Sequence, residues 1–331
     1  MNKMIFLTTL VLGTGISISA QSWMGLWMGL EMNLLSIVPL MNSSKNMLAS
    51  ECSLKYFFTQ AIASTVLIYS LIILSLKNNM NSWILTPPLP IIMDISLFMK
   101  MGAAPLHFWF PEVMEGLSWM NALVMMTWQK IAPLMALFNV PKPPFLIQAT
   151  IIMSILIGGL MGINQTSMRK ILAYSSITHL GWMISTLSLN LSLTLNYFMI
   201  YSLISLNLIM ILKTLNLFHI QQLFTINNNL MKISFLSNFL SMGGVPPFLG
   251  FLPKWMVLNS LAKNHLNLSL MMVVLTLVTL YFYTRCIIPF LTLETSETKY
   301  NWKKMPNFLM WWMNWFNILA LILCTVWFNL T

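Results

Sequence analysis

The chain has 331 residues, of which 58% are hydrophobic and only 7% are Asp, Glu, Lys or Arg, and its mean hydropathy is +0.78. A soluble domain carries roughly 25% charged residues, so this composition excludes a soluble globular protein and indicates a polytopic membrane protein. The formal net charge of +10 does not indicate nucleic-acid binding, because the basic residues are scattered along the chain rather than clustered with aromatic residues.

Apolar stretches long enough to cross a bilayer follow one another along the chain. A helical span needs about 20 apolar residues, whereas a lipid-facing strand has about ten alternating ones, so the stretches predict an all-α bundle. Eleven spans are predicted, at roughly 5–20, 22–40, 54–76, 84–108, 118–139, 144–163, 167–188, 191–217, 233–256, 267–291 and 307–328. The connections between them are too short to hold an extramembrane domain.

The first of these stretches has two interpretations. Lys3 precedes an apolar run that ends in small residues, as in a secretory signal peptide. A retained membrane helix is favoured, because a second span follows at once.

Basic residues are distributed unequally between the two sides of the predicted membrane. Loops on the side of the N-terminus hold eight Lys and Arg residues, against three on the other side. By the positive-inside rule, the N-terminus and the 292–306 loop face the compartment of synthesis, and the C-terminus faces away from it.

Three ionisable side chains fall near the middle of predicted spans. Glu31 lies in the second span, Lys100 in the fourth and Lys130 in the fifth. A charge at the bilayer centre costs about 2.5–3.5 kcal/mol on insertion scales, so something must offset that cost. For these three residues we favour a functional role. Moving a carboxylate relative to a buried lysine changes how strongly the lysine holds its proton, which is the physical requirement for a proton relay.

Other polar groups within spans have both a structural and a functional interpretation. Lys55 and Arg285 lie close enough to span ends for their charged groups to reach the membrane interface. His179 is central in the seventh span, where it either forms a hydrogen bond for packing or takes part in function. Lys254 lies near the end of the ninth span.

Two predicted helices are interrupted by glycine and proline, at 100–111 in the fourth span and 243–254 in the ninth. Such breaks free backbone carbonyls, which is tolerated at membrane depth only where they face protein or a wet cavity. The two helices cross the membrane in opposite directions, which predicts an inverted repeat and an ion site. We therefore expect a first five-helix repeat over 1–140, a second over 141–291, the 292–306 loop and a C-terminal helix over 307–331.

Several motifs together resemble a known family. They are GLWMGLEMN at 25–33, KYFFTQ at 55–60, the segment 100–111, TWQKIAP at 127–133, GINQTSMRK at 162–170, YSSITHLGWM at 174–183 and the segment 242–255. These residues resemble the subunit 2 family of mitochondrial NADH:ubiquinone oxidoreductase, the respiratory complex I, over about residues 22–290.

The resemblance implies an antiporter-like, proton-pumping core subunit of the inner mitochondrial membrane, with its N-terminus in the matrix and its C-terminus toward the intermembrane space. Glu31 matches the family's switching glutamate, Lys100 the lysine it modulates, Lys130 the central lysine and Lys254 the lysine of the second interrupted helix. Implied partners are other complex I subunits, including neighbouring antiporter-like subunits, and membrane lipids.

The resemblance places NADH, FMN, iron–sulfur and ubiquinone chemistry in other subunits, so this chain contributes to an H⁺-translocating NADH:ubiquinone reductase without holding a redox centre. Its residues agree, because they include no dinucleotide fingerprint and no cysteine cluster. Lys55 and His179 match polar positions near a hydrated axis. The three cysteines lack metal-ligand spacing and are interpreted as small packing residues.

Asp94 departs from the family pattern, in which a small or hydroxyl residue is expected. It lies six residues before Lys100, and this spacing puts the two side chains on different helix faces. Asp94 either pairs with a lysine of another helix or subunit, or carries a proton. Two other functions are compatible with the sequence: a self-standing cation/proton antiporter, and a structural membrane subunit that moves no protons.

Overall fold

The computed structural model describes residues 2–42, 46–78, 88–225 and 229–292. Their regular secondary structure is helical, joined by turns and short loops, and one isolated β-bridge pairs Ser167 with His219. The described residues form two compact units, one over Met1–Thr150 and one from Ile151 onward. The predicted all-α fold is confirmed. The predicted 292–306 loop and C-terminal helix lie outside the described residues, apart from Thr292 at the end of the last helix.

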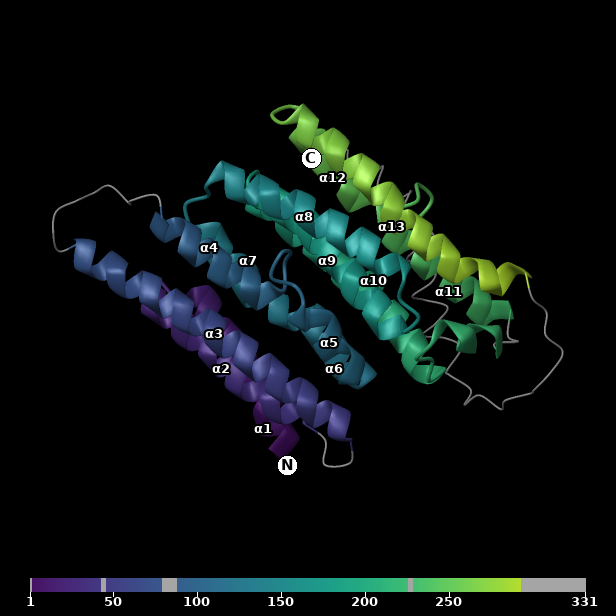
Figure 1. Ribbon diagram of the computed structural model, residues 1–331, viewed down its shortest axis with the longest axis horizontal. Helices are drawn as coiled ribbons and strands as arrows, with labels where there is room; N and C mark the ends of the chain where they lie inside the picture. The colour runs from purple at the N-terminus through teal and green to yellow at the C-terminus, as the bar shows by residue number, and fades with distance from the viewer. Residues whose placement is uncertain (1, 43–45, 79–87, 226–228, 293–331) are drawn as a thin grey trace. The chain divides into compact units, whose positions relative to one another are not determined.

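The first unit is built from helices that pack mainly against their neighbours in the sequence (Figure 1). α1 packs against α2 and α2 against α3, while α4 packs against both α3 and α7. Their bounds are α1 Asn2–Ser19, α2 Trp23–Met41, α3 Met47–Asn78, α4 Pro88–Met101, α5 Trp109–Gly116, α6 Trp119–Met126 and α7 Trp128–Asn139.

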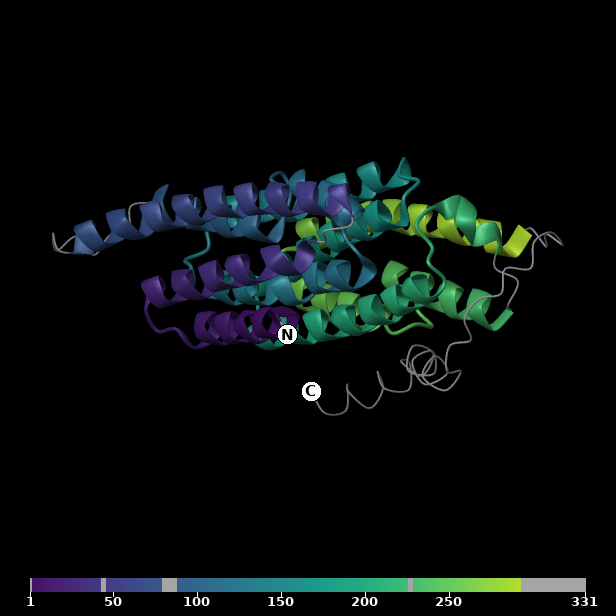
Figure 2. The same ribbon diagram turned by 90° about the horizontal axis from the view of Figure 1, so that it is seen from below.

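Small residues allow α1 and α2 to approach closely. A Cβ added at Gly29 would lie 2.6 Å from the Ser17 backbone nitrogen, and one at Gly13 would lie 2.5 Å from the Asn33 side chain. Small residues at helix interfaces are the usual means of tight packing in membranes, because lipid supplies no hydrophobic force between helices. The two helices run side by side in both ribbon views (Figures 1 and 2).

In the second unit, α10 packs against α9, α11 and α12, and α13 packs against α11 and α12. The bounds are α8 Pro144–Ile163, which crosses the boundary between the units, α9 Met168–Leu187, α10 Leu191–Thr214, the 3₁₀ helix Ile220–Thr225, α11 Asn229–Gly243, α12 Phe251–Ala262 and α13 Leu266–Thr292. All side chains of α9 are buried except those of Arg169 and Lys170, so α9 forms the centre of this unit.

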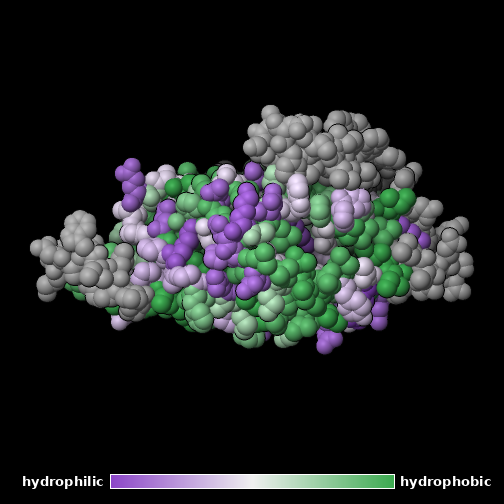
Figure 3. Space-filling model, turned by 90° about the horizontal axis from the view of Figure 1, so that it is seen from above, coloured by the Kyte–Doolittle hydropathy of each residue, from purple (hydrophilic) through white to green (hydrophobic). Residues whose placement is uncertain are grey.

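The surface shows large apolar areas, as is typical of a protein whose helices face lipid (Figure 3). On α13 they follow one helix face through Leu270, Val274, Leu277, Tyr281 and Ile288, which are 54–62% exposed. Within the described residues, five helices are long and apolar enough to cross a membrane, namely α2, α3, α8, α10 and α13.

Both predicted interruptions are present, and their helices end in the same way. After α4, Ala103 donates to the Phe98 carbonyl and Gly102, at φ +73°, donates to the Met99 carbonyl. After α11, Val245 donates to the Leu240 carbonyl in the same way. Gly244, at φ +77°, donates to the Ser241 carbonyl. This is the Schellman motif, whose left-handed position favours glycine. The chain then resumes as α5 and as α12.

A third interruption was not predicted. The fifth span was expected as one helix over 118–139, but it consists of α6 and α7, which meet at Thr127. Thr127 has φ −114° and ψ −73°, outside regular helical values, and its hydroxyl donates to the Leu123 carbonyl at 2.8 Å. The distorted turn lies directly before Lys130, whose N–H bonds the Thr127 carbonyl at 3.1 Å.

Candidate functional site

Glu31 and Lys100 interact electrostatically within the first unit. Lys100 lies in the last turn of α4 and is 7% exposed. The charge of Glu31 on α2 acts on it and on the Tyr56 hydroxyl of α3. One carboxylate oxygen of Glu31 is buried and has no hydrogen-bond partner among the described residues. The charge of Glu31 thus acts on Lys100 across two helices that both pack against α3 and α7, while the functional pairing of the two residues stays a prediction.

Side chains from α3 and α5 donate hydrogen bonds to carbonyls in the last turn of α4. Gln60 Nε2 donates to the Lys100 carbonyl at 3.3 Å, and Trp109 Nε1 donates to the Met99 carbonyl at 3.1 Å. Buried backbone carbonyls need such partners in a membrane, since no bulk water reaches them. Gln60 and Trp109 were not predicted as site residues, although a polar side chain within an apolar span could have indicated Gln60.

Lys130 is the most deeply buried of the predicted site lysines, at 1% exposed. Its ammonium lies 5.3 Å from the centre of the Phe110 ring, where the negative face of the ring attracts a cation. It projects from the first turn of α7, directly after the Thr127 interruption. Lys130 is thus held at depth beside a distorted helix, as Lys100 is.

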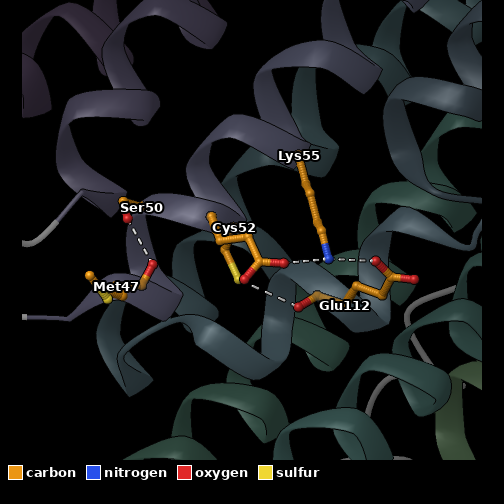
Figure 4. Close-up of polar contacts among 6 residues, drawn as sticks. Met47, Ser50, Cys52, Lys55 and Glu112 are labelled. Carbon is orange, nitrogen blue, oxygen red and sulfur yellow. Dashed lines mark hydrogen bonds and ion pairs between the residues drawn. The ribbon is translucent and has the colours of Figure 1, made fainter.

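Lys55 forms surface ion pairs rather than lying in the interior. Its ammonium lies 2.9 Å from Glu51 Oε1 and 3.1 Å from Glu112 Oε2, and all three side chains are 43–60% exposed (Figure 4). Exposed ion pairs contribute about 0–1 kcal/mol to stability. This position agrees with the interfacial interpretation of Lys55.

Lys254 lies on α12 and reaches back to the break that precedes its helix. Its ammonium donates to the Gly243 carbonyl at 2.8 Å and contacts the Met242 carbonyl at 3.5 Å. The same ammonium lies 5.9 Å from the Trp182 ring centre. A Cβ at Gly244 would lie 2.8 Å from Lys254 Cδ, so a larger residue there would displace the end of the lysine side chain.

His179 lies in the centre of α9, 7% exposed, and its Nδ1 is 2.9 Å from the Tyr197 hydroxyl on α10. Arg285 is exposed on α13 and its guanidinium donates to the carbonyl of Ile163, the last residue of α8. A cation at a helix C-terminus is favoured by the helix dipole, which gives Arg285 a structural role.

The described residues contain no group of three or more His, Cys, Asp or Glu that could hold a metal ion. Cys52 and Cys286 are buried free thiols, and Cys324 lies outside the described residues.

Asp94 is 1% exposed on α4, and both of its carboxylate oxygens are buried without a hydrogen-bond partner among the described residues. The charge that acts on it is that of Lys142, in the segment between α7 and α8. Burial lowers the pKa of the Lys142 ammonium, and the Asp94 charge opposes that shift. Burial of a carboxyl without a hydrogen bond favours its protonated form, whereas the charge of Lys142 favours the ionised form, so both alternatives for Asp94 stay open.

We expect Lys142→Met to lower the thermal stability of the assembled protein, because it leaves the Asp94 carboxylate buried without a counter-charge. Asp94→Asn in the same chain should restore most of the loss, with a coupling free energy of about 0.5–3 kcal/mol. Thermal melting of the two single variants and the double variant measures this coupling. Additive effects would show that the two side chains do not interact.

Comparison with known proteins decides the family. The model of the transmembrane family "NADH:quinone oxidoreductase/Mrp antiporter" matches residues 20–279. The chain belongs to this family. It is 49% identical over 309 residues to NADH-ubiquinone oxidoreductase chain 2 of Anopheles gambiae, covering 92% of this chain and 89% of that protein. The corresponding protein of Locusta migratoria is 46% identical over 287 residues, covering 86% and 83%.

The antiporter family also accounts for the fold. A chain in the structure of respiratory complex I from Thermus thermophilus with bound aureothin superposes with a TM-score of 0.85 at 24% identity, covering 98% of this chain and 78% of that one. The family resemblance seen in the sequence is confirmed by the family model and the curated relatives. Charged groups at membrane depth are costly and mark functional sites, which directs attention to the buried lysines and Glu31.

Proposed function

We propose that the chain is a core membrane-arm subunit of the proton-pumping NADH:ubiquinone oxidoreductase of the mitochondrial inner membrane. Its relatives carry the name of that enzyme's chain 2, and the family match spans most of the chain. The observation that carries the proposal is that Lys100, Lys130 and Lys254 are each buried beside an interrupted helix. The reactions of NADH, FMN, iron–sulfur clusters and ubiquinone belong to other subunits, which are its partners together with membrane lipids.

For the architecture we propose eleven spans, in which 1–140 and 141–291 are inverted repeats and 307–331 adds a last helix after the 292–306 loop. The matching Schellman ends of α4 and α11 support the repeat, since each begins an interruption that a new helix closes. The excess of basic residues in loops on the side of the N-terminus supports an orientation with the N-terminus in the matrix and the C-terminus toward the intermembrane space.

For the mechanism we propose that electron transfer elsewhere in the complex shifts Glu31 relative to Lys100. The proton affinity of Lys100 changes with the distance of that carboxylate, because opposite charges stabilise each other strongly where the dielectric constant is low. Protons then pass through bridging water by way of Lys130 and Lys254. The loose Glu31–Lys100 arrangement supports this step, since a tightly bonded pair would resist the movement. Lys55 and His179 have auxiliary roles at the uptake side and along the path.

The test is Glu31→Gln in the assembled complex reconstituted into liposomes, with protons translocated per electron as the readout. The amide keeps the size of the side chain but cannot carry the charge that modulates Lys100. We expect a lower proton-to-electron ratio, while NADH oxidation by an artificial electron acceptor is unchanged. Glu115→Gln on the exposed surface of α5 is the matched control and should keep the ratio. A wild-type ratio in Glu31→Gln refutes the relay.

The alternative is a self-standing cation/proton antiporter. The family description, which includes Mrp antiporters, supports this alternative. It predicts sodium- or potassium-driven proton flux by the purified chain alone in liposomes. A purely structural subunit predicts instead that apolar replacements of Glu31 and Lys130 leave pumping unchanged.

A further inference from the structure

The core of the second unit contains a cluster of buried hydroxyl groups around His179 that the relay described so far does not use. We call it the hydroxyl cluster. Each member is at most 2% exposed, although an apolar core would be cheaper to build from phenylalanine and alanine. The cluster consists of Ser175, Ser176, Tyr197, Tyr201 and Tyr283.

Helix geometry explains why these side chains meet. Ser175 and Ser176 lie four and three residues before His179 on α9, so each lies near its face of the helix, and Tyr197 and Tyr201 are four residues apart on α10. His179 Nδ1 lies 2.9 Å from the Tyr197 hydroxyl, and the Tyr201 ring packs on the imidazole with 4.9 Å between centres. α9 and α10 pack against each other, so the two faces form one interface.

The cluster continues beyond this first hydrogen bond. The Tyr201 hydroxyl interacts with Ser176 on α9. The Tyr283 hydroxyl of α13 interacts with Ser175 and acts electrostatically on Tyr197 and Tyr201. The Tyr283 hydroxyl makes no direct hydrogen bond of standard geometry within the described residues, and water commonly bridges buried polar groups of this kind. Hydroxyls from three helices thus belong to one cluster, in which Tyr197 and Tyr201 contact the imidazole directly.

The same face of α9 leads to Lys254. Trp182 follows His179 by three residues on the helix, and the Lys254 ammonium lies 5.9 Å from the Trp182 ring. His179 therefore lies on α9 between Trp182 and the two serines. Trp182 is the residue next to Lys254, and the serines are the residues next to Tyr201 and Tyr283. The position of the cluster indicates a connection to the relay rather than an isolated packing motif.

We propose that the Tyr197 hydroxyl is the proton-relay partner of His179, and that the hydroxyl cluster extends the proton path of the second unit. This inference rests on the proposed proton-pumping function. The imidazolium gives its Nδ1 proton to the Tyr197 oxygen, while the Tyr197 hydroxyl gives its own proton to the next hydroxyl or water. The tyrosine stays neutral, the histidine becomes neutral, and one proton has moved. After the transfer the Tyr197 hydroxyl donates to the neutral Nδ1. Its rotation toward the next hydroxyl or water, together with reprotonation of His179, restores Tyr197 as the acceptor of the Nδ1 proton.

The test is Tyr197→Phe in the assembled complex, with protons translocated per electron measured beside Glu31→Gln. Phenylalanine keeps the buried ring but cannot pass a proton, so we expect the ratio to fall by as much as it does in Glu31→Gln. Tyr197→His restores a group that both accepts and donates protons and should recover at least half of the lost ratio. If Tyr197 only filled space, phenylalanine would be tolerated better than histidine.

Tyr281→Phe is the matched control, because it removes an exposed hydroxyl from α13 two residues from Tyr283 and should keep the wild-type ratio. Should Tyr197→Phe fail to assemble, Tyr283→Phe tests the same cluster, and a lowered ratio is expected there too. A wild-type ratio in the assembled phenylalanine variant, with a lowered ratio in Glu31→Gln, overturns this inference alone. Wild-type ratios in both variants overturn the proposed function as well.

Discussion

Lys130→Met is expected to lower the proton-to-electron ratio of the complex as much as Glu31→Gln does, while its thermal stability stays the same or rises. Methionine has a similar length and fills the site beside Phe110, but it carries no proton. A lysine 1% exposed in an apolar core is costly to bury, so removing its charge relieves that cost. Proton translocation and thermal melting of the same preparation measure both effects.

The control for Lys130→Met is Lys263→Met, which removes an exposed lysine that follows α12. It should change neither the ratio nor the melting temperature. Loss of assembly in Lys130→Met with a normal ratio in the residual complex would assign Lys130 a structural role and contradict the relay.

Gly244→Ala is expected to impair both stability and pumping. At φ +77° a residue with a Cβ is strained by about 1–3 kcal/mol, and the added carbon would lie 2.8 Å from Lys254 Cδ and 3.0 Å from its Nζ. The ammonium must therefore leave the Gly243 carbonyl. We expect a lower melting temperature of the complex and a proton-to-electron ratio near that of Lys254→Met.

The neighbouring glycine provides a sharp comparison. A Cβ at Gly243 would meet only Tyr283 Cδ2 at 3.6 Å, an ordinary contact, and its backbone is helical. Gly243→Ala should therefore assemble and pump as the wild type does. Equal effects of the two alanine variants would show that the placement of Lys254 does not depend on the conformation of Gly244.

The sequence predicted the all-α fold and both interruptions, because clustered glycine and proline within a long apolar run disfavour an unbroken helix. It also singled out Lys100, Lys130 and Lys254, since a charge within an apolar span is readily recognised. These three side chains are indeed buried. Their proposed role as a proton relay remains a prediction.

Other features depend on tertiary contacts that no local pattern reveals. The break at Thr127 has no glycine, and Pro133 lies six residues away, so a continuous helix was the simpler expectation. Lys55 was within reach of the interface, but its partner Glu112 is 57 residues away. The hydroxyl cluster was missed because serine and tyrosine are common in apolar spans, and only packing of three helices brings them around His179.

The two Schellman ends have an electrostatic consequence. α4 and α11 each end inside the bundle, and a helix C-terminus carries a partial charge of about −0.5. Lys100 lies in the last turn of α4, and Lys254 bonds the last carbonyls of α11. Both ammonium groups thus receive part of their counter-charge from backbone dipoles. Unlike a carboxylate, a backbone carbonyl neither takes up the proton nor changes rotamer. Each lysine can therefore lose and regain its proton while the partial negative charge beside it stays constant.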